Sequence, residues 1–85
     1  MAVKLVKKGI KMFKTFVTFG QNHLHKIGLK VFDKDSVAVI KSADEKSGRE
    51  LAFKYFGDKF FTTYFEDKFN MEYMIYFPRG LIEVE

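Results

Sequence analysis

Two histidines and two aspartates share an i, i+2 spacing in the first half of the chain, and both residue types ligate metal ions. His23 and His25 end the stretch TFGQNHLH, and Asp33 and Asp35 follow at the same interval ten residues later. In an extended segment, residues two apart point to the same side of the backbone. Imidazole and carboxylate groups on one side would suit zinc or manganese. The alternatives are a polar loop, which we favour, and histidines that contact a partner, so we expect no metal site.

Serine, histidine and carboxylate groups form no recognisable catalytic set. The serines are Ser36, Ser42 and Ser47, and no histidine accompanies a Gly-x-Ser-x-Gly nucleophile motif. Glu66 and Asp67 are adjacent and would point to opposite sides of a strand, and the sequence has no glycine-rich phosphate-binding loop. We therefore expect a protein that is not an enzyme and that uses no cofactor.

The chain contains no cysteine, which excludes disulfides, thiol catalysis and thiolate zinc sites. Its 85 residues suffice for one domain. No apolar run reaches the roughly 18 residues of a membrane span. We expect a single domain in a reducing cytoplasm.

Positive charge is concentrated at the start of the chain. The net charge is +4, and residues 1–11, MAVKLVKKGIK, contain four lysines and no acid. The remaining eleven Lys and Arg are balanced by eleven Asp and Glu, so residues 12–85 are neutral. We interpret residues 1–11 as a basic leader or tail that precedes a single domain of residues 12–85. If this leader has a function of its own, we expect it to contact phosphates or a membrane surface. Its lysines are Lys4, Lys7, Lys8 and Lys11.

Aromatic residues make up 18% of the chain and include eleven Phe, which permits two interpretations. They form the core beneath a helix, or some of them form a sheet surface on which bases stack between cations. Because one helix cannot cover so many rings, we expect one sheet face to stay exposed and to contact a partner or a second copy of the chain. The nucleic-acid alternative would use the four leader lysines together with Lys14, Lys30, Lys59, Phe16, Phe19, Phe60 and Tyr64.

The segment YFPRG places aromatic and arginine side chains beside a Pro-Gly turn. These residue types are enriched in the central contacts of protein interfaces. The structural alternative is a turn whose rings pack into the end of the core. We predict that Arg79, Tyr76 and Phe77 contact a protein partner, with His23 and His25 as further contacts.

Three segments in the first half of the chain have strand patterns. Residues 13–19 are β-branched and aromatic and stop at Gly20, and only one of their two faces is broadly apolar. Residues 21–35 mix turn residues with a short strand pattern at 29–32, so we expect a long loop or an irregular hairpin arm. Residues 37–40, VAVI, form a continuous apolar run typical of a central strand buried on both faces.

One helix is predicted after this strand. Ser42 and Glu45 have the spacing of a capping box, Gly57 stands where a left-handed C-cap is expected, and Gly48 weakens the middle. Residues 58–65 and 81–84 have strand patterns, whereas 66–77 fit either a helical turn or an extended segment. The predicted fold class is α+β: a small, mostly antiparallel sheet of about three to five strands, in the order β-(β)-β-α-β-β, with one main helix packed on one face.

Several short segments resemble those of small uncharacterised bacteriophage proteins: TFGQ after the first strand, VAVI, the FGDKF junction after the helix, Tyr64 and the YFPRGLIEV ending. The resemblance covers about residues 12–84. Proteins of that group often carry Trp after the FG junction, where this chain has Phe60 and Phe61. The resemblance implies a small phage accessory protein that acts by binding, and that engages or inhibits a host or defence protein in the cytoplasm of the infected cell. It implies no catalytic residues.

Overall fold

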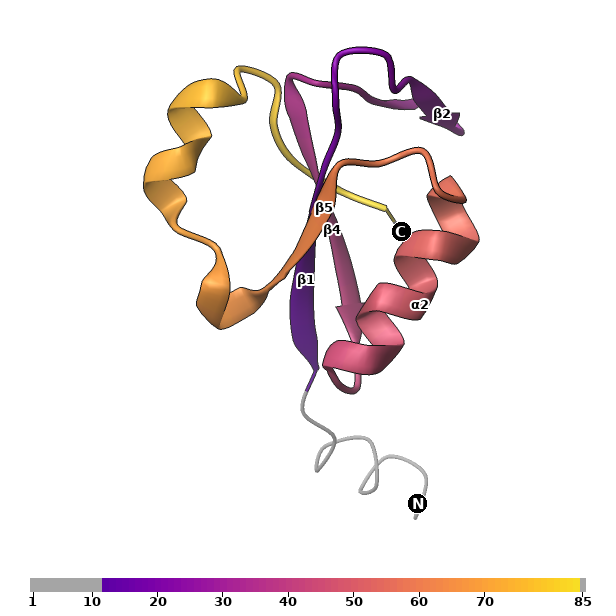
Figure 1. Cartoon of the computed structure of the whole chain (residues 1–85), viewed down its shortest axis with the longest axis vertical. Coiled ribbons are helices and arrows are strands. Elements are labelled where there is room, and N and C mark those ends of the chain that lie inside the picture. The colour runs from indigo at the N-terminus through magenta and orange to yellow at the C-terminus, as the bar shows by residue number, and fades with distance from the viewer. Residues whose placement is uncertain (1–11, 85) are drawn as a thin grey trace.

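The structure is a computed structural model that describes residues 12–84 and has the predicted α+β architecture (Figure 1). The leader lysines, and with them the prediction for residues 1–11, lie outside the described residues. The elements in chain order are β1 (Phe13–Thr18), β2 (His25–Ile27), β3 (Lys30–Phe32), β4 (Ser36–Ser42), α2 (Glu45–Phe56), β5 (Thr62–Phe65), the 3₁₀ helices η1 (Glu66–Lys68) and η2 (Met71–Tyr76), and β6 (Gly80–Glu83).

The main sheet has four strands in the order β5-β1-β4-β6. β1 pairs antiparallel with both β4 and β5, and β6 pairs parallel with β4. The predicted central strand 37–40 is therefore confirmed within β4, where residues 36–40 are all buried. β2 and β3 form a separate hairpin in the region predicted as an irregular arm, and the turn between them uses Gly28 at φ 61°, which glycine adopts without strain.

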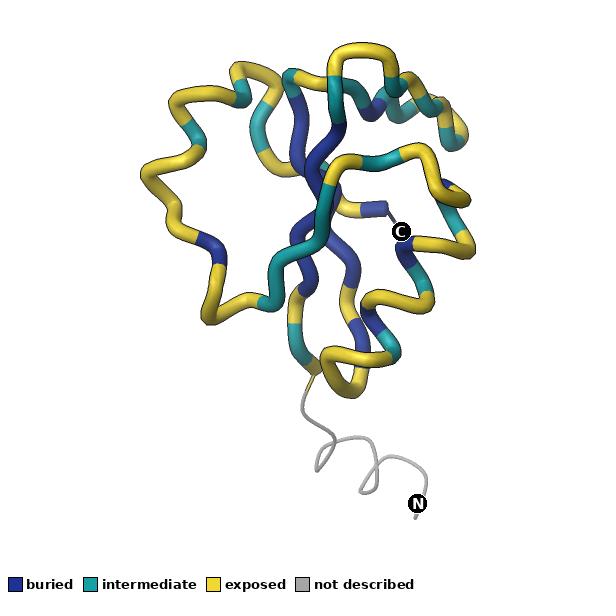
Figure 2. The backbone as a smooth tube through the Cα atoms, viewed as in Figure 1, coloured by how far each residue is buried: buried dark blue, intermediate teal, exposed yellow. Residues whose placement is uncertain are grey.

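Both faces of the sheet are covered, so the molecule has three layers (Figure 1). α2 packs on one face of the sheet. Ala52 and Phe56 of the helix form a buried cluster there with Val17, Ala38 and Ile40 of the strands. Successive residues of a strand point to opposite faces, and the alternate residues Phe16, Val37 and Val39 pack with Phe69 on the second face. Figure 2 shows the resulting dark band of buried backbone along the two central strands.

The expectation that one sheet face stays exposed is wrong. The segment 66–77, which the sequence left undecided, crosses the second face and covers it. Phe16 is stacked on Phe69 with ring centroids 4.6 Å apart, and only 7% of Phe16 is exposed. Some of the rings in excess of what one helix covers therefore form a second core.

The helix begins later than its predicted cap. Ser42 belongs to β4, and its hydroxyl donates to the backbone oxygen of Asp44 at 2.7 Å. Asp44 is the N-cap instead: its carboxylate accepts from the backbone N–H of Ser47 at 2.8 Å. The predicted position of the C-cap is confirmed, because α2 ends at Gly57, which has a positive φ of 63° and whose N–H donates to the oxygen of Phe53; its ψ of −134° lies outside the left-handed helical region.

The N-cap makes helix stability depend on pH. The pKa of Asp44 lies below its usual 3.8, mainly because the carboxylate accepts the backbone hydrogen bond of Ser47 and then its side-chain hydrogen bond. A lowered pKa in the folded state means that the stabilisation is present above the unfolded pKa and is lost as pH falls through the folded pKa. Asp44→Asn keeps a capping oxygen without the charge. We expect the stability of the natural protein relative to Asp44→Asn to decline below about pH 4, measured by urea unfolding from pH 7 to pH 2.5. A constant difference across that range would contradict this assignment.

α2 approaches β1 closely at Gly48. A Cβ at this position would overlap Oγ1 of Thr15 and would lie 3.0 Å from Oγ of Ser42. The Thr15 hydroxyl is buried under the helix and has no hydrogen-bond partner among the described residues. The absence of a side chain at Gly48 thus sets the spacing between the helix and the sheet.

Removing the unpaired hydroxyl should stabilise the protein. Thr15→Val keeps the side-chain shape and removes the cost of a buried polar group without a partner, so we expect the free energy of unfolding to rise by about 1 kcal/mol. Thr63→Val is the matched control, since Thr63 lies partly exposed on β5 opposite Val17 and should change stability by less than about 0.5 kcal/mol. Equal effects of the two substitutions in urea unfolding would refute the explanation.

Candidate binding cleft

An aromatic cleft opens where the end of β1, the start of β5 and η2 meet. It has a volume of about 260 Å³ and no Lys, Arg, His, Asp or Glu among its lining residues. We call it the aromatic cleft; its lining residues are Thr18, Phe19, Phe61, Tyr64, Tyr73, Tyr76 and Phe77.

The geometry of the 3₁₀ helix explains why η2 presents rings to the cleft. With three residues per turn, side chains at i and i+3 lie above one another. Tyr73 and Tyr76 therefore share one row, and both line the cleft. Met74 and Phe77 follow in the next row and pack on the second core, while Ile75 is 78% exposed.

The rings of the cleft are available for contact. Phe61 is 71% and Tyr76 is 68% exposed, whereas Tyr64 and Tyr73 contact each other with centroids 6.0 Å apart. Among residues 12–84, the hydroxyls of these three tyrosines have no hydrogen-bond partner. The cleft thus offers apolar ring faces and free hydroxyl groups, which suit binding better than chemistry.

Of the predicted partner contacts, Tyr76 and Phe77 are brought together in the cleft, and Arg79 is not. Nε of Arg79 donates to both carboxylate oxygens of Asp33, at 3.2 and 3.1 Å. Its backbone N–H donates to the oxygen of Asp35 at 2.8 Å. Arg79 therefore ties the turn before β6 to the turn before β4, although half of its side chain remains exposed.

The two histidines contact different parts of the chain. Nδ1 of His23 accepts from the backbone N–H of Gly20 at 2.9 Å. Nε2 of His25 lies 2.6 Å from the oxygen of Lys59, and its ring packs edge-on against Phe56 with centroids 4.9 Å apart. Within residues 12–84 there is no group of three or more His, Asp or Glu placed to hold a metal ion. His23 instead closes the β1–β2 loop on itself, and His25 attaches the β2–β3 hairpin to the turn after α2.

The residues of the nucleic-acid alternative are dispersed. Phe16 and Phe19 are buried, so neither can stack on a base. Phe60 and Tyr64, predicted on one strand face, belong to opposite sides of the sheet, because β5 begins only at Thr62 and Phe60 lies in the preceding turn.

The predicted cations are also separated. Lys14 lies near the start of β1, away from the cleft end of that strand, and its backbone N–H donates to Glu66 at 2.7 Å. Nζ of Lys30 donates to the oxygen of Glu83 at 2.6 Å. Lys59 is exposed in the turn that follows α2. The three cations therefore lie on three different segments: β1, β3 and the turn after α2.

Phe61 and Tyr73 were missed as site residues. Phe61 lay in the strand predicted for residues 58–65, and Tyr73 lay in the undecided segment 66–77. The signal for Tyr73 is the three-residue spacing within MEYMIY, which separates Tyr73 and Tyr76 from Met71 and Met74. Nothing in the local sequence distinguishes the exposed Phe61 from the partly buried Phe60 beside it.

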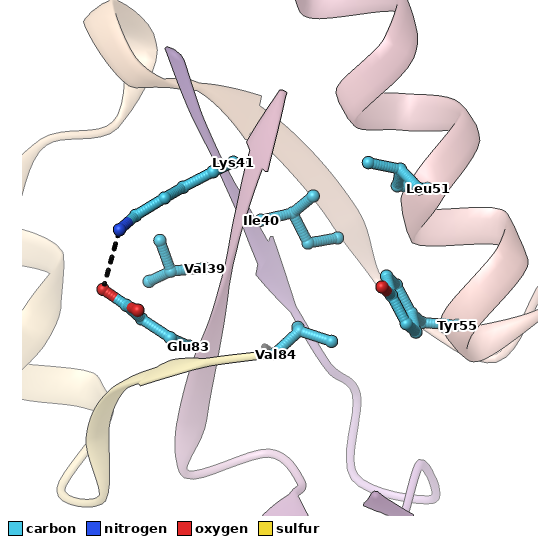
Figure 3. A pocket seen from close by; sticks show the side chains of 7 residues that line it. All are labelled: Val39, Ile40, Lys41, Leu51, Tyr55, Glu83 and Val84. Atoms are coloured by element: carbon cyan, nitrogen blue, oxygen red, sulfur yellow. Dashed lines mark ion pairs between the residues drawn. The ribbon is translucent and has the colours of Figure 1, made fainter. Parts of the chain in front are cut away.

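A second, smaller hollow of about 160 Å³ lies between α2 and the β4–β6 edge (Figure 3). Leu51 and Tyr55 of the helix face Ile40 and Val84 across it, and Lys41 pairs with Glu83 at 3.6 Å on its outer side. Both members of that ion pair are more than half exposed. We interpret this hollow as the open margin of the α2 core.

Comparison of the chain with protein-family models, curated proteins and solved structures found no match. None of the helices in residues 12–84 has the length and apolar character that crossing a bilayer requires.

Proposed function

We propose that this protein acts by binding another protein through the aromatic cleft. The observation that carries the proposal is the exposure of Phe61 and Tyr76 at a cleft without charged lining residues. Folding alone gives no reason to leave large rings in water, since burying an aromatic side chain is favourable. Exposed rings grouped around a hollow are typical of the central contacts of protein interfaces.

The proposed setting is a small bacteriophage accessory protein that engages or inhibits a host or defence protein in the cytoplasm of the infected cell. This part rests on the resemblance of the short segments TFGQ, FGDKF and YFPRG to those of phage proteins. A homodimer is compatible with the fold through the outer edges of β5 and β6, because edge strands present unpaired backbone groups. Light scattering at several concentrations measures whether the dimer forms.

Affinity capture from host lysate tests the proposal. We expect Tyr76→Ala and Phe61→Ala to lose a partner that the natural protein retains, and to lose it equally at low and high salt, because ring burial is little screened. Leu29→Ala is the matched control: Leu29 is fully exposed at the β2–β3 turn, outside the cleft. Retention of the same partners by all three variants would reject the aromatic cleft as the interface.

The nucleic-acid alternative now depends on the leader lysines alone. Binding through these lysines should weaken steeply from about 0.05 to 0.5 M salt, because it releases counterions. It should also vanish in a chain that begins at Met12. Salt-resistant binding of nucleic acid by that shorter chain would instead favour a role for residues 12–85.

A further inference from the structure

We infer that the aromatic cleft takes an extended, proline-containing segment of its partner, with a Lys or Arg beside the prolines. This inference deepens the proposed function and rests on it. Three features of the cleft carry it: ring faces, free hydroxyl groups and the charge of the surrounding segment.

The ring faces suit proline. Six of the seven lining residues are aromatic, and aromatic-lined grooves recognise polyproline II segments, whose rings pack flat against aromatic side chains. The polyproline II helix is already formed before binding, so docking costs little conformational entropy. The Tyr73 and Tyr76 row, set by the 3₁₀ repeat of η2, provides two such surfaces one turn apart.

The hydroxyl groups suit a backbone that lacks donors. The hydroxyls of Tyr64, Tyr73 and Tyr76 can donate, and none has an acceptor among residues 12–84. A proline-rich segment has backbone carbonyl oxygens that no internal hydrogen bond satisfies, and its prolines have no N–H. Donors on the cleft and acceptors on the segment therefore complement each other.

The size of the cleft and the charge beside it limit which partner segments can bind there. Its volume of about 260 Å³ falls below the roughly 300–1,000 Å³ of most small-molecule sites and accommodates a few side chains of an extended segment. Glu72 precedes Tyr73 on η2, is exposed and forms no ion pair among residues 12–84. Glu66 and Asp67 lie at the other end of β5, where Glu66 accepts from the backbone N–H of Lys14. The free carboxylate of Glu72 favours a partner with a basic residue near its prolines, and opposes phosphate groups.

Titration of the full chain with synthetic peptides tests the inference. The probe is acetyl-ARAPPLPAK-amide, and the comparison peptides replace its three prolines by alanine or its Arg and Lys by Glu. We expect saturable shifts of the amide NMR signals of residues 61–77 with the probe. We expect affinity at least about fivefold weaker for either comparison peptide.

Variants of the protein locate the binding. Tyr76→Ala should weaken probe binding by about tenfold or more, and the pair Tyr73→Phe with Tyr76→Phe by several-fold, because only the hydroxyl groups are lost. Leu29→Ala should leave the affinity unchanged. The NMR spectrum of each free variant verifies that it is folded.

Three outcomes would overturn the inference: no binding of the probe, equal binding of the proline-free peptide, or probe binding that Tyr76→Ala leaves intact. A partner captured through Tyr76 while the probe fails to bind would reject the proline segment and leave the proposed function standing. Loss of both would reject the two together.

Discussion

Replacing Gly48 by alanine should lower the free energy of unfolding by about 3 kcal/mol, in spite of the higher helix propensity of alanine. A methyl group there would overlap Oγ1 of Thr15 and crowd Oγ of Ser42. The obstructing atoms belong to short, buried side chains of β1 and β4, which have no room to turn away, so α2 itself must shift from the sheet. Urea unfolding measures the loss.

A double-mutant cycle identifies the cause of this loss. Thr15→Ala removes the obstructing hydroxyl, so Gly48→Ala should cost at least about 1 kcal/mol less in that background. Ser47→Ala, one residue earlier on the same helix, is the control for helix propensity and should have a small effect. Additive costs of Gly48→Ala and Thr15→Ala would show that the overlap is not the cause.

Phe69→Ala should cost about 3–4 kcal/mol, the usual loss for a buried phenylalanine. Phe69 is 7% exposed and contacts Phe16, Tyr64 and Tyr73 through its ring. It is therefore the main attachment of the segment 66–77 to the second face of the sheet. Calorimetric or urea unfolding gives the size of the effect.

The same substitution should also disturb the cleft, because η2 follows Phe69 and forms one wall of it. Hydrogen exchange should rise in residues 66–77 of Phe69→Ala before it rises in β1 and β4, since local opening precedes global unfolding. Met71→Ala is the matched control, because Met71 is exposed on the same segment. Uniform acceleration over the whole domain would contradict a separate attachment of this layer.

Much of the sheet and helix was predictable from local pattern. The β-branched and aromatic run at 13–19 predicted β1, the apolar run VAVI predicted β4 with its burial on both faces, and Gly57 predicted the end of α2. The burial of β1 on both faces was not predicted, because only one face of that run looked broadly apolar. The cap was misplaced because the sequence SADE contains two residues able to cap a helix, Ser42 and Asp44. Only the strand pairing of Ser42 with Phe13 decides between them.

The second layer was not predictable in the same way. The side chains of a 3₁₀ helix repeat every three residues, which lies between the period of about 2 for a strand and about 3.6 for an α-helix. The segment MEYMIY therefore matched neither the strand pattern nor the α-helix pattern. The parallel pairing of β6 with β4 joins segments far apart in sequence, and no local signal specifies it. The aromatic cleft depends on η2, which supplies Tyr73 and Tyr76 to its lining. Tyr76 and Phe77 were therefore found only through the YFPRG motif, and Phe61 and Tyr73 were not found.

The central claim is that a partner protein contacts the aromatic cleft. Site-specific photo-crosslinking tests it most directly, with p-benzoylphenylalanine placed at Tyr76 in one protein and at Leu29 in another, both in host cells. We expect a discrete covalent adduct from position 76 that Phe61→Ala abolishes, and none from position 29. Adducts of the same partner from position 29 but not from position 76 would show that the protein binds through another surface, and would contradict the account.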